Sequence, residues 1–330
     1  MRICVTGGAG YIGSHAVKML VNHGHDVVVV DNLSTGYEQA VDPNATFYNC
    51  SILETDRLVS IFQEEAIEAI MHFAAFSIVP ESMKNPLKYY NNNVYGTSCL
   101  LEAMHQANVT YIIFSSTAAV YGEQTTMPIT EDMEELPTNP YGQTKLAMEH
   151  MMHWAEKAYG IKHIALRYFN VAGAYHDGSI GEAHNPETHL IPLILQVPLG
   201  QREEIYIFGD DYDTPDGSCI RDYIHVEDLI DAHILAIDYV KKTNNSTYFN
   251  LGSGDGYSVK EMIEAARDVT NLEIKASVKG RREGDPARLI ASSQKAKDIL
   301  KWAPKYTHVK DIIKAAWQFH ESHPNGYHND

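Results

Sequence analysis

Short apolar runs alternate with amphipathic segments along the first half of the chain. Between these runs, apolar positions recur about every 3.6 residues near 55–65, 92–107 and 140–159, which is typical of helices packed on one face. The runs themselves are rich in β-branched and aromatic residues and have the length of buried strands: ICVT, VVVV, TFYN, AIMHF, YIIFS and IALRYF. This alternation predicts an α/β fold built on a doubly wound parallel sheet.

The pattern changes beyond about residue 172. Gly, Pro and His are scattered through the stretch GAYHDGSIGEAHNPETHLIP, as is typical of loops rather than of another strand–helix repeat. We therefore expect one domain over residues 1–172 and a smaller, mixed α/β domain over 173–330. Segments of the later chain can return to the first domain.

The segment NPYGQTKLAMEH opens the longest predicted helix and places Tyr141 four residues before Lys145. Pro140 suits the first position of a helix. At about 100° per residue, one narrow stripe holds Tyr141, Lys145, Met148, Met152, Ala155 and Tyr159, and the opposite side holds Gln143, His150, His153 and Lys157. Lys145 thus lies within an apolar stripe, where it either extends its stem along the apolar surface or serves the chemistry of Tyr141.

Composition and net charge limit the kinds of molecule that the chain can bind. The chain has 330 residues, of which 44% are hydrophobic, enough for a large core in one big or two smaller domains. Its 26 basic and 43 acidic residues give a net charge of −17 without a long run of like charge. This balance argues against nucleic acid or an anionic membrane as a partner, so any phosphate must be bound locally.

The cysteines and histidines suggest neither a disulfide framework nor a metal site. Cys4, Cys50, Cys99 and Cys219 stand far apart. The 17 histidines show no metal-ligand grouping in the sequence, so no metal is expected. The start MRICVTGG has no leader pattern, and no apolar stretch approaches the ~18 residues of a membrane span, so we expect a cytoplasmic protein.

The strongest local signal is a strand, a glycine turn and a helix in RICVTGGAGYIGSH. Gly7, Gly10 and Gly13 would let a pyrophosphate approach the bare backbone, and the helix N-terminus would supply amide groups to it. The second strand ends in Asp31, whose carboxylate would bind both ribose hydroxyls and repel a 2′-phosphate. The pattern therefore predicts a dinucleotide site that prefers NAD to NADP.

The glycine spacing and the Tyr-x-x-x-Lys motif together resemble the extended short-chain dehydrogenase/reductases that act on nucleotide sugars. The resemblance covers nearly the whole chain and is closest to the UDP-galactose/UDP-glucose 4-epimerase family. Eight motifs occur in the family's order: TGGAGYIGSH, HFAAFSIVPES, NNVYGT, FSSTAAVYG, NPYGQTKLAMEH, LRYFNVAGA, RDYIHVEDL and GRREGDPA.

The resemblance implies an NAD-binding Rossmann-type domain over 1–172, a UDP-sugar-binding domain over 173–330 and tightly bound NAD. It also implies the cofactor-binding residues Gly7, Gly10, Tyr11, Ile12, Gly13, Asp31, Asn32, Ser51, Ile52, Phe73, Ala74, Ala75, Asn92, Ser115, Tyr141, Lys145 and Tyr168. Two of the family's cofactor contacts differ here. Ser51 stands where many members have an aspartate for the adenine, and Ser77 where some have a lysine, so NAD is expected to be held less tightly.

The family's catalytic residues correspond to Tyr141, Lys145 and Thr117. Tyrosine has a pKa near 10, so a phenolate base at pH 7 needs about 4 kcal/mol of stabilisation, part of which an ammonium and a positive nicotinamide can supply. Related 4,6-dehydratases carry an acidic pair after the threonine, where this chain has Ala118 and Ala119. Dehydration would therefore lack its acid and base, and inversion at C4 is expected instead.

For the substrate, the resemblance implies binding by Thr117, Tyr141, Asn170, His189, Leu190, Tyr206, Phe208, Arg221, Tyr223, Arg282, Asp285 and Leu289. Leu289 occupies the position at which the family admits or excludes N-acetylated sugars. UDP-N-acetylhexosamine or UDP-uronate 4-epimerisation therefore stays open as an alternative, as does a dinucleotide-sensing regulator without catalysis. Family members commonly pair through two helices, so a homodimer is expected.

Overall fold

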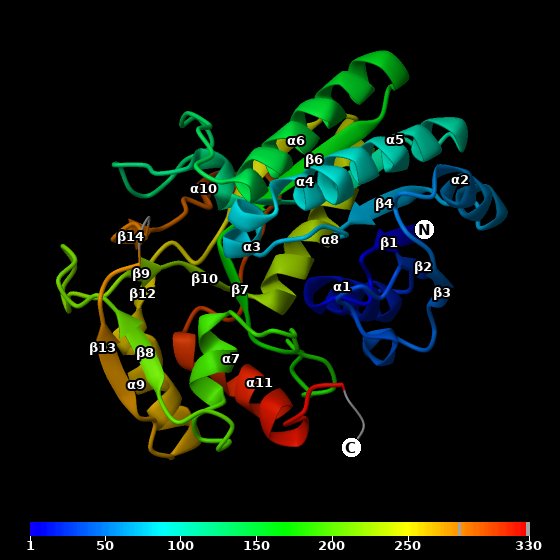
Figure 1. Cartoon of the computed structure of the whole chain (residues 1–330). Helices are drawn as coiled ribbons and strands as arrows, with labels where there is room; N and C mark the ends of the chain where they lie inside the picture. The colour runs from blue at the N-terminus through cyan, green and yellow to red at the C-terminus, as the bar shows by residue number, and fades with distance from the viewer. Residues whose placement is uncertain (283–284, 328–330) are drawn as a thin grey trace.

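In the computed structural model, which describes residues 1–282 and 285–327, a large parallel sheet with helices on both faces adjoins a smaller part (Figure 1). The sheet has seven strands in the order β11-β6-β5-β4-β1-β2-β3, all parallel. Their bounds are β1 (Arg2–Thr6), β2 (Asp26–Asp31), β3 (Thr46–Asn49), β4 (Ala69–His72), β5 (Tyr111–Thr117), β6 (Lys162–Tyr168) and β11 (Thr247–Leu251). The predicted doubly wound sheet is confirmed, and six of its strands coincide with the six apolar runs.

Two helical layers cover the sheet because alternate strand residues face opposite sides. On one face, α1 (Tyr11–Asn22) and α8 (Val226–Thr243) bury residues such as Leu20 and Leu229 against the sheet. On the other face, α2 (Thr55–Glu64), α5 (Gly96–Gln106) and α6 (Pro140–Tyr159) contribute a second core. The short elements between them are η1 (Glu38–Ala40), α3 (Val79–Lys84), α4 (Pro86–Tyr89), η2 (Tyr90–Tyr95) and η3 (Ala118–Tyr121).

The large sheet is completed by a late segment of the chain. After leaving β6, the chain builds the first strands of the smaller part and then returns through α8 and β11. β11 pairs in parallel with β6, with Thr247 opposite Ile164 and Leu251 opposite Tyr168. The edge of the sheet therefore depends on residues far along the sequence.

The smaller part lies at the lower left of Figure 1 and has its own apolar core, formed mainly by three helices and β8. Its short strands form three small sheets, β10-β7, β12-β9-β14 and β13-β8. The bounds are β7 (Asn170–Ala172), α7 (Leu190–Leu195), β8 (Ile205–Phe208), β9 (Ile220–Arg221), β10 (Tyr223–His225), β12 (Tyr257–Ser258), α9 (Val259–Thr270), β13 (Ala276–Lys279), β14 (Arg288–Leu289), α10 (Gln294–Ile299) and α11 (Val309–Ser322). Within the described ranges, no helix is long and apolar enough to cross a bilayer.

The predicted stripe on α6 agrees with the structure except at its end. Lys145, Met148, Met152 and Ala155 are buried, whereas Tyr159 is 48% exposed and stacks on His105 of α5, with ring centres 4.1 Å apart. The stripe loses its cover there because Tyr159 is the last residue of the helix, before Gly160 ends it with a φ of +75°.

Candidate active site

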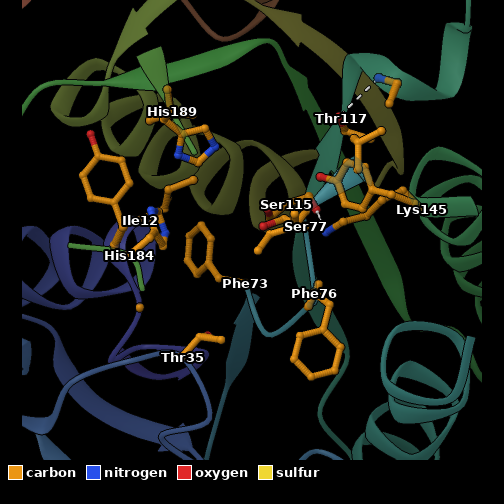
Figure 2. A pocket seen from close by; sticks show the side chains of 18 of the residues that line it. Ile12, Thr35, Phe73, Phe76, Ser77, Ser115, Thr117, Lys145, His184 and His189 are labelled. Carbon is orange, nitrogen blue, oxygen red and sulfur yellow. Dashed lines mark hydrogen bonds between the residues drawn. The ribbon is translucent and has the colours of Figure 1, made fainter. Parts of the chain in front are cut away.

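A cavity of about 860 Å³ opens at the carboxyl ends of the large sheet's strands, against the smaller part. This edge is where ligands bind in doubly wound sheets. In Figure 2, Thr117 and Lys145 lie on one side of the cavity, His184 and His189 on the other, and Phe73 between them. The cavity thus brings together residues from both parts of the chain.

The glycine turn forms one wall of this cavity. Gly7, Gly10 and Gly13 line the cavity, and so do Tyr11 and Ile12 at the start of α1. A Cβ atom on Gly7, whose φ is +75°, would lie 2.6 Å from the backbone nitrogen of Ala74, and one on Gly13 would lie 2.0 Å from the carbonyl oxygen of Gly7. No side chain fits there, so the helix start stays open to an anion.

Asp31 stands at the end of β2 and lines the cavity beside Asn32. Its carboxylate accepts hydrogen bonds from the backbone amides of Ala9 (3.0 Å) and Leu33 (2.8 Å). Burial raises its pKa, and the two amide bonds oppose that rise. The carboxylate is therefore held against the glycine turn, where a ribose would meet it.

Tyr141 and Lys145 enter the cavity from the first turns of α6. The helix begins after Asn139, whose side chain accepts a hydrogen bond from the Gly142 amide at 2.9 Å. Lys145 is 2% exposed, donates to the Ser115 carbonyl oxygen at 2.7 Å and lies 5.9 Å from the centre of the Tyr141 ring. The ammonium is thus fixed by β5 and faces the tyrosine.

Burial acts on the two pKa values in opposite directions. It raises the pKa of Tyr141 to about 12, against a hydrogen bond from the Thr117 hydroxyl, and lowers the pKa of Lys145 to about 7. We expected a stabilised phenolate, but in this arrangement Tyr141 favours its neutral form at pH 7, and the pKa of Lys145 is shifted toward its neutral form. The reason is that loss of hydration outweighs the attraction between charges that do not touch.

A buried network of hydrogen bonds, which could not be predicted from the sequence, joins α6 to the neighbouring strands β5 and β6. Glu149 lies one turn after Lys145, accepts from Arg167 Nε at 3.0 Å and from the Ser116 hydroxyl at 2.5 Å, and opposes the lowered pKa of Lys145. Arg167 also donates to the hydroxyl of Tyr121 at 3.0 Å. Glu149 directly follows Met148 of the apolar stripe, which was a signal in the sequence that this carboxylate is buried. A buried carboxylate needs a buried partner.

At the far end of the cavity, the predicted substrate residues of the smaller part come together. Arg221 donates to the Asp285 carboxylate at 3.1 Å and to the Pro286 carbonyl at 2.8 Å, and both Arg221 and Asp285 line the cavity. Leu289 pairs with Arg221 across β14 and β9. The remaining predicted residues that line the cavity from this side are Asn170, Tyr223, His189 and Leu190.

The cofactor predictions also converge on the cavity, with one exception. The other predicted cofactor residues that line it are Ile52, Phe73, Ala74, Ala75, Asn92, Ser115 and Tyr168. The predicted catalytic residue Thr117 and Ser77 lie there as well. The Ser115 hydroxyl is hydrogen-bonded to the Tyr168 hydroxyl. Ser51 is not among the described lining residues, and its side chain accepts a hydrogen bond from the Leu53 amide at 3.2 Å.

Three predicted substrate residues are also outside the described lining: Tyr206, Phe208 and Arg282. The Arg282 guanidinium lies 3.8 Å from the centre of the Phe208 ring instead. Glu283 and Gly284 of the same motif fall outside the described residues. Sequence reasoning also missed the lining residues Glu182 and His184, although the spacing Glu-x-His-x-x-Glu-x-His over 182–189 was a visible signal.

Comparison with known proteins identifies the class to which this fold and cavity belong. The chain matches the NAD dependent epimerase/dehydratase family over residues 3–252. It is 58% identical over 327 residues to a UDP-glucose 4-epimerase of Lacticaseibacillus casei, across 99% of both proteins. A crystal structure of a UDP-glucose 4-epimerase is 58% identical, with a TM-score of 0.98 over 100% of both chains. That of the UDP-glucose 4-epimerase from Bifidobacterium longum, in complex with NAD⁺ and UDP, is 37% identical, with a TM-score of 0.93 over 99% of this chain and 100% of the other.

The chain therefore belongs to the NAD-dependent epimerase/dehydratase family. Within that family, these full-length relatives are UDP-glucose 4-epimerases. The predicted family, the isomerase activity and NAD as the cofactor are thereby confirmed.

Proposed function

We propose that the chain interconverts UDP-galactose and UDP-glucose by inverting C4 through a transient 4-keto sugar. The observation that carries this proposal is the meeting of Tyr141, Lys145 and Thr117 in one cavity with the glycine turn and Asp31. An NAD held by the turn would then present its nicotinamide to a sugar beside the tyrosine. The relatives named UDP-glucose 4-epimerase support the same assignment.

Tyr141 is proposed to take the proton of the C4 hydroxyl as the C4 hydride passes to NAD⁺. Thr117 would donate a hydrogen bond to the reacting oxygen, and Lys145 would favour the phenolate electrostatically. The 4-keto sugar then presents its other face to the reduced cofactor. Return of the same hydride and proton gives the inverted alcohol and regenerates NAD⁺.

This cycle requires a firm hold on the nucleotide and a loose hold on the hexose. Arg221 and Asp285 are proposed to hold the diphosphate and the ribose, with Asn170 nearby; the guanidinium fork suits phosphate oxygens. The Arg221–Asp285 ion pair at 3.1 Å would then be exchanged in part for contacts with the substrate. The bound Bifidobacterium longum enzyme, which holds NAD⁺ and UDP, supports a UDP-sugar as the substrate class.

The first experiment is to incubate the purified protein with UDP-galactose without added NAD and to quantify UDP-glucose by chromatography. UDP-N-acetylgalactosamine in a parallel reaction tests the alternative that Leu289 leaves open. Product from UDP-galactose is expected and would also show that NAD stays bound. If product appears only after NAD is added, the mechanism stands and the cofactor is held weakly, as Ser77 would imply. No product under either condition would refute the proposed activity.

We further infer a homodimer in the cytoplasm. Apolar side chains are exposed on the outer helices, among them Trp154 at 64% and Tyr159 at 48% on α6, and α5 and α6 lie side by side (Figure 1). The buried, unpaired cysteines fit a reducing compartment. Light scattering after gel filtration should give twice the mass of one chain, and the Trp154→Glu variant should give the mass of a single chain. Leu272→Glu, at an exposed site after α9, should leave the mass unchanged.

A further inference from the structure

Four side chains of the loop between β7 and α7 converge beside the cavity. Glu182, His184, Glu187 and His189 each place one oxygen or nitrogen atom within 4.8 Å of the others. The loop carries them on the side of the cavity opposite Lys145 and Thr117, where Figure 2 shows the two histidines next to each other. The group is therefore distinct from the reacting residues.

The separations among these atoms match those of ligands around one metal ion. His184 Nδ1 lies 3.1 Å from Glu182 Oε1 and 3.7 Å from Glu187 Oε2. His189 Nδ1 lies 2.5 Å from Glu182 Oε1 and 3.7 Å from Glu187 Oε1. Donor atoms at 2.0–2.2 Å from a tetrahedral ion stand about 3.4 Å apart. The His189–Glu182 separation is shorter than this, so a small outward shift of the Glu182 carboxylate would make room for a metal ion.

The nitrogen of His184 supplies a second, independent sign of a ligand site. Nδ1 is buried and has no hydrogen-bond partner among the described residues, although the Glu182 oxygen is only 3.1 Å away. A proton on that nitrogen would not point at the oxygen well enough to bond. A neutral nitrogen with its lone pair directed at a shared ion would account for both the proximity and the missing bond.

Charge balance favours a bound metal ion, rather than protonation of the two histidines, as the means of neutralising the two carboxylates. Glu182 is 3% exposed, and two carboxylates so close to each other need neutralisation when buried. Protonating both histidines would place two positive rings 5.1 Å apart between their centres. One divalent cation would neutralise both carboxylates and leave the imidazoles neutral, which is the form that binds metals.

We propose that Glu182, His184, Glu187 and His189 bind one first-row divalent transition-metal ion, for which Zn²⁺ is the best match. Two imidazole nitrogens and two carboxylate oxygens suit a tetrahedral zinc site, whereas Ca²⁺ and Mg²⁺ prefer oxygen ligands alone. This proposal is independent of the proposed reaction, because the ion pairs of the four side chains join them to one another, and within the described residues none of their hydrogen bonds or ion pairs joins them to Tyr141 or Thr117.

The ion would have a structural role. It would tie both ends of the segment 182–189, which has no helix or strand of its own, and so fix the start of α7 at Leu190. His184 also lies edge-on to Tyr11 of the glycine turn, with ring centres 6.2 Å apart. A bound ion would therefore hold the loop against the cofactor side of the cavity.

The test uses the full chain, purified without a histidine tag, and measures metal content by mass spectrometry. After chelation and removal of the chelator, Zn²⁺ is titrated by calorimetry and Co²⁺ by its visible absorption. We expect about one Zn²⁺ per chain, a tetrahedral Co²⁺ spectrum and a melting temperature that rises with Zn²⁺. His184→Asn and Glu187→Gln should each weaken Zn²⁺ binding by at least about 100-fold, more than loss of an outer-shell partner costs.

His176→Gln is the matched control, since His176 lies on the same loop and pairs with Glu227 outside the four residues. It should bind Zn²⁺ like the parent protein. If the parent binds no Zn²⁺ or Co²⁺ under these conditions, or if both variants bind them as tightly as the control does, the proposal is wrong. Should His184→Asn fail to fold, the Glu187→Gln variant and the Zn²⁺ content of the parent protein decide.

Discussion

Burial makes Tyr141 a weaker acid and Lys145 a weaker base than the free side chains, so we expect the charge of a bound NAD to influence whether Tyr141 is ionised. With a pKa of about 12, the phenol would cost about 7 kcal/mol to ionise at pH 7. A positive nicotinamide ring near it lowers that cost, and the ring loses its charge when it accepts hydride. In the proposed cycle the proton would therefore return to the sugar once the cofactor is oxidised again, and proton transfer would be linked to hydride transfer.

The first prediction concerns the Tyr141 hydroxyl. Tyr141→Phe should reduce turnover of UDP-galactose by about 100- to 10,000-fold, the range that general base catalysis typically contributes. NAD should remain bound in the variant, as measured by extraction and absorbance. Tyr159→Phe, which removes an exposed hydroxyl from the same helix, should retain full turnover. A Tyr141→Phe enzyme with near-normal turnover would show that another group is the base.

The second prediction concerns the width of the sugar site at Leu289. Leu289→Tyr would place a ring into the cavity that Leu289 lines, and should depress turnover of UDP-N-acetylgalactosamine selectively if the parent protein uses it. We expect at least about a tenfold change in the ratio of kcat/KM values for the two sugars, equivalent to about 1.4 kcal/mol. Equal losses on both sugars would mean that Leu289 does not select the substrate.

Residue identities in local motifs could be predicted from the sequence, but their partners could not. Tyr141, Lys145, Thr117 and Asp31 belong to short motifs at strand or helix ends, and all four line the cavity. The pairing of Arg221 with Asp285 joins residues 64 positions apart, and no periodicity relates them. The apolar stripe identified Lys145 as unusual, yet the pKa shifts depend on burial that only the packed structure defines.

At the scale of elements, the contact between α6 and η3 sets the position of the tyrosine. Gly142 follows Tyr141 at the start of α6, and a Cβ atom on it would lie 2.5 Å from the Ala119 carbonyl oxygen. The helix can thus approach the end of β5 closely, and Thr117 becomes a hydrogen-bond partner of Tyr141. One missing side chain therefore helps align residues from two elements.

The third prediction follows from this close approach. Gly142→Ala should lower the free energy of unfolding by about 1–3 kcal/mol, because overpacking against a backbone atom outweighs the better helix propensity of alanine. Turnover should fall with it, since α6 must move away from Thr117. Gln143→Ala, one residue further on the exposed side, should change neither quantity. Urea titration and the epimerase assay measure the two effects; a more stable Gly142→Ala protein would contradict the packing argument.

Element types were predictable where the pattern was local, whereas sheet membership was not. The six early strands and the helix over 140–159 follow from apolar runs and a period of 3.6. The short strand TYFNL, which forms β11, carries no signal that it pairs with β6. That pairing is decided by α8, which brings the chain back across the sheet and buries residues such as Ile230 and Ile237 there.

At the scale of the whole molecule, buried neutral histidines make the fold sensitive to acid. Burial lowers the pKa of each of five histidines to about 3 or 4, well below 6.5: His15, His72, His163, His225 and His233. Below pH 6.5 the unfolded chain binds protons that the folded chain does not, so stability falls as the pH falls through this window.

The fourth prediction is therefore a loss of stability between pH 6.5 and about pH 4. Each of the five histidines should cost about 1.4 kcal/mol at one pH unit below 6.5, so the melting temperature should drop clearly between pH 7.5 and 5.5. Calorimetry measures it. His72→Asn should flatten the acid slope, whereas His153→Gln, at an exposed site on α6, should leave it unchanged. A melting temperature that rises on acidification would refute the assignment of these histidines as neutral.

The return of the chain through α8 and β11 also sets an order of events during synthesis. While residues up to 172 emerge from the ribosome, the sheet has no β11 at its edge and no α8 over the face that Leu229 and Ile237 later cover. A nascent chain of that length exposes apolar surface and an unpaired strand edge, both of which favour aggregation. Cooperative folding of the larger part must therefore wait until Leu251 has left the exit tunnel, when about three quarters of the chain has emerged.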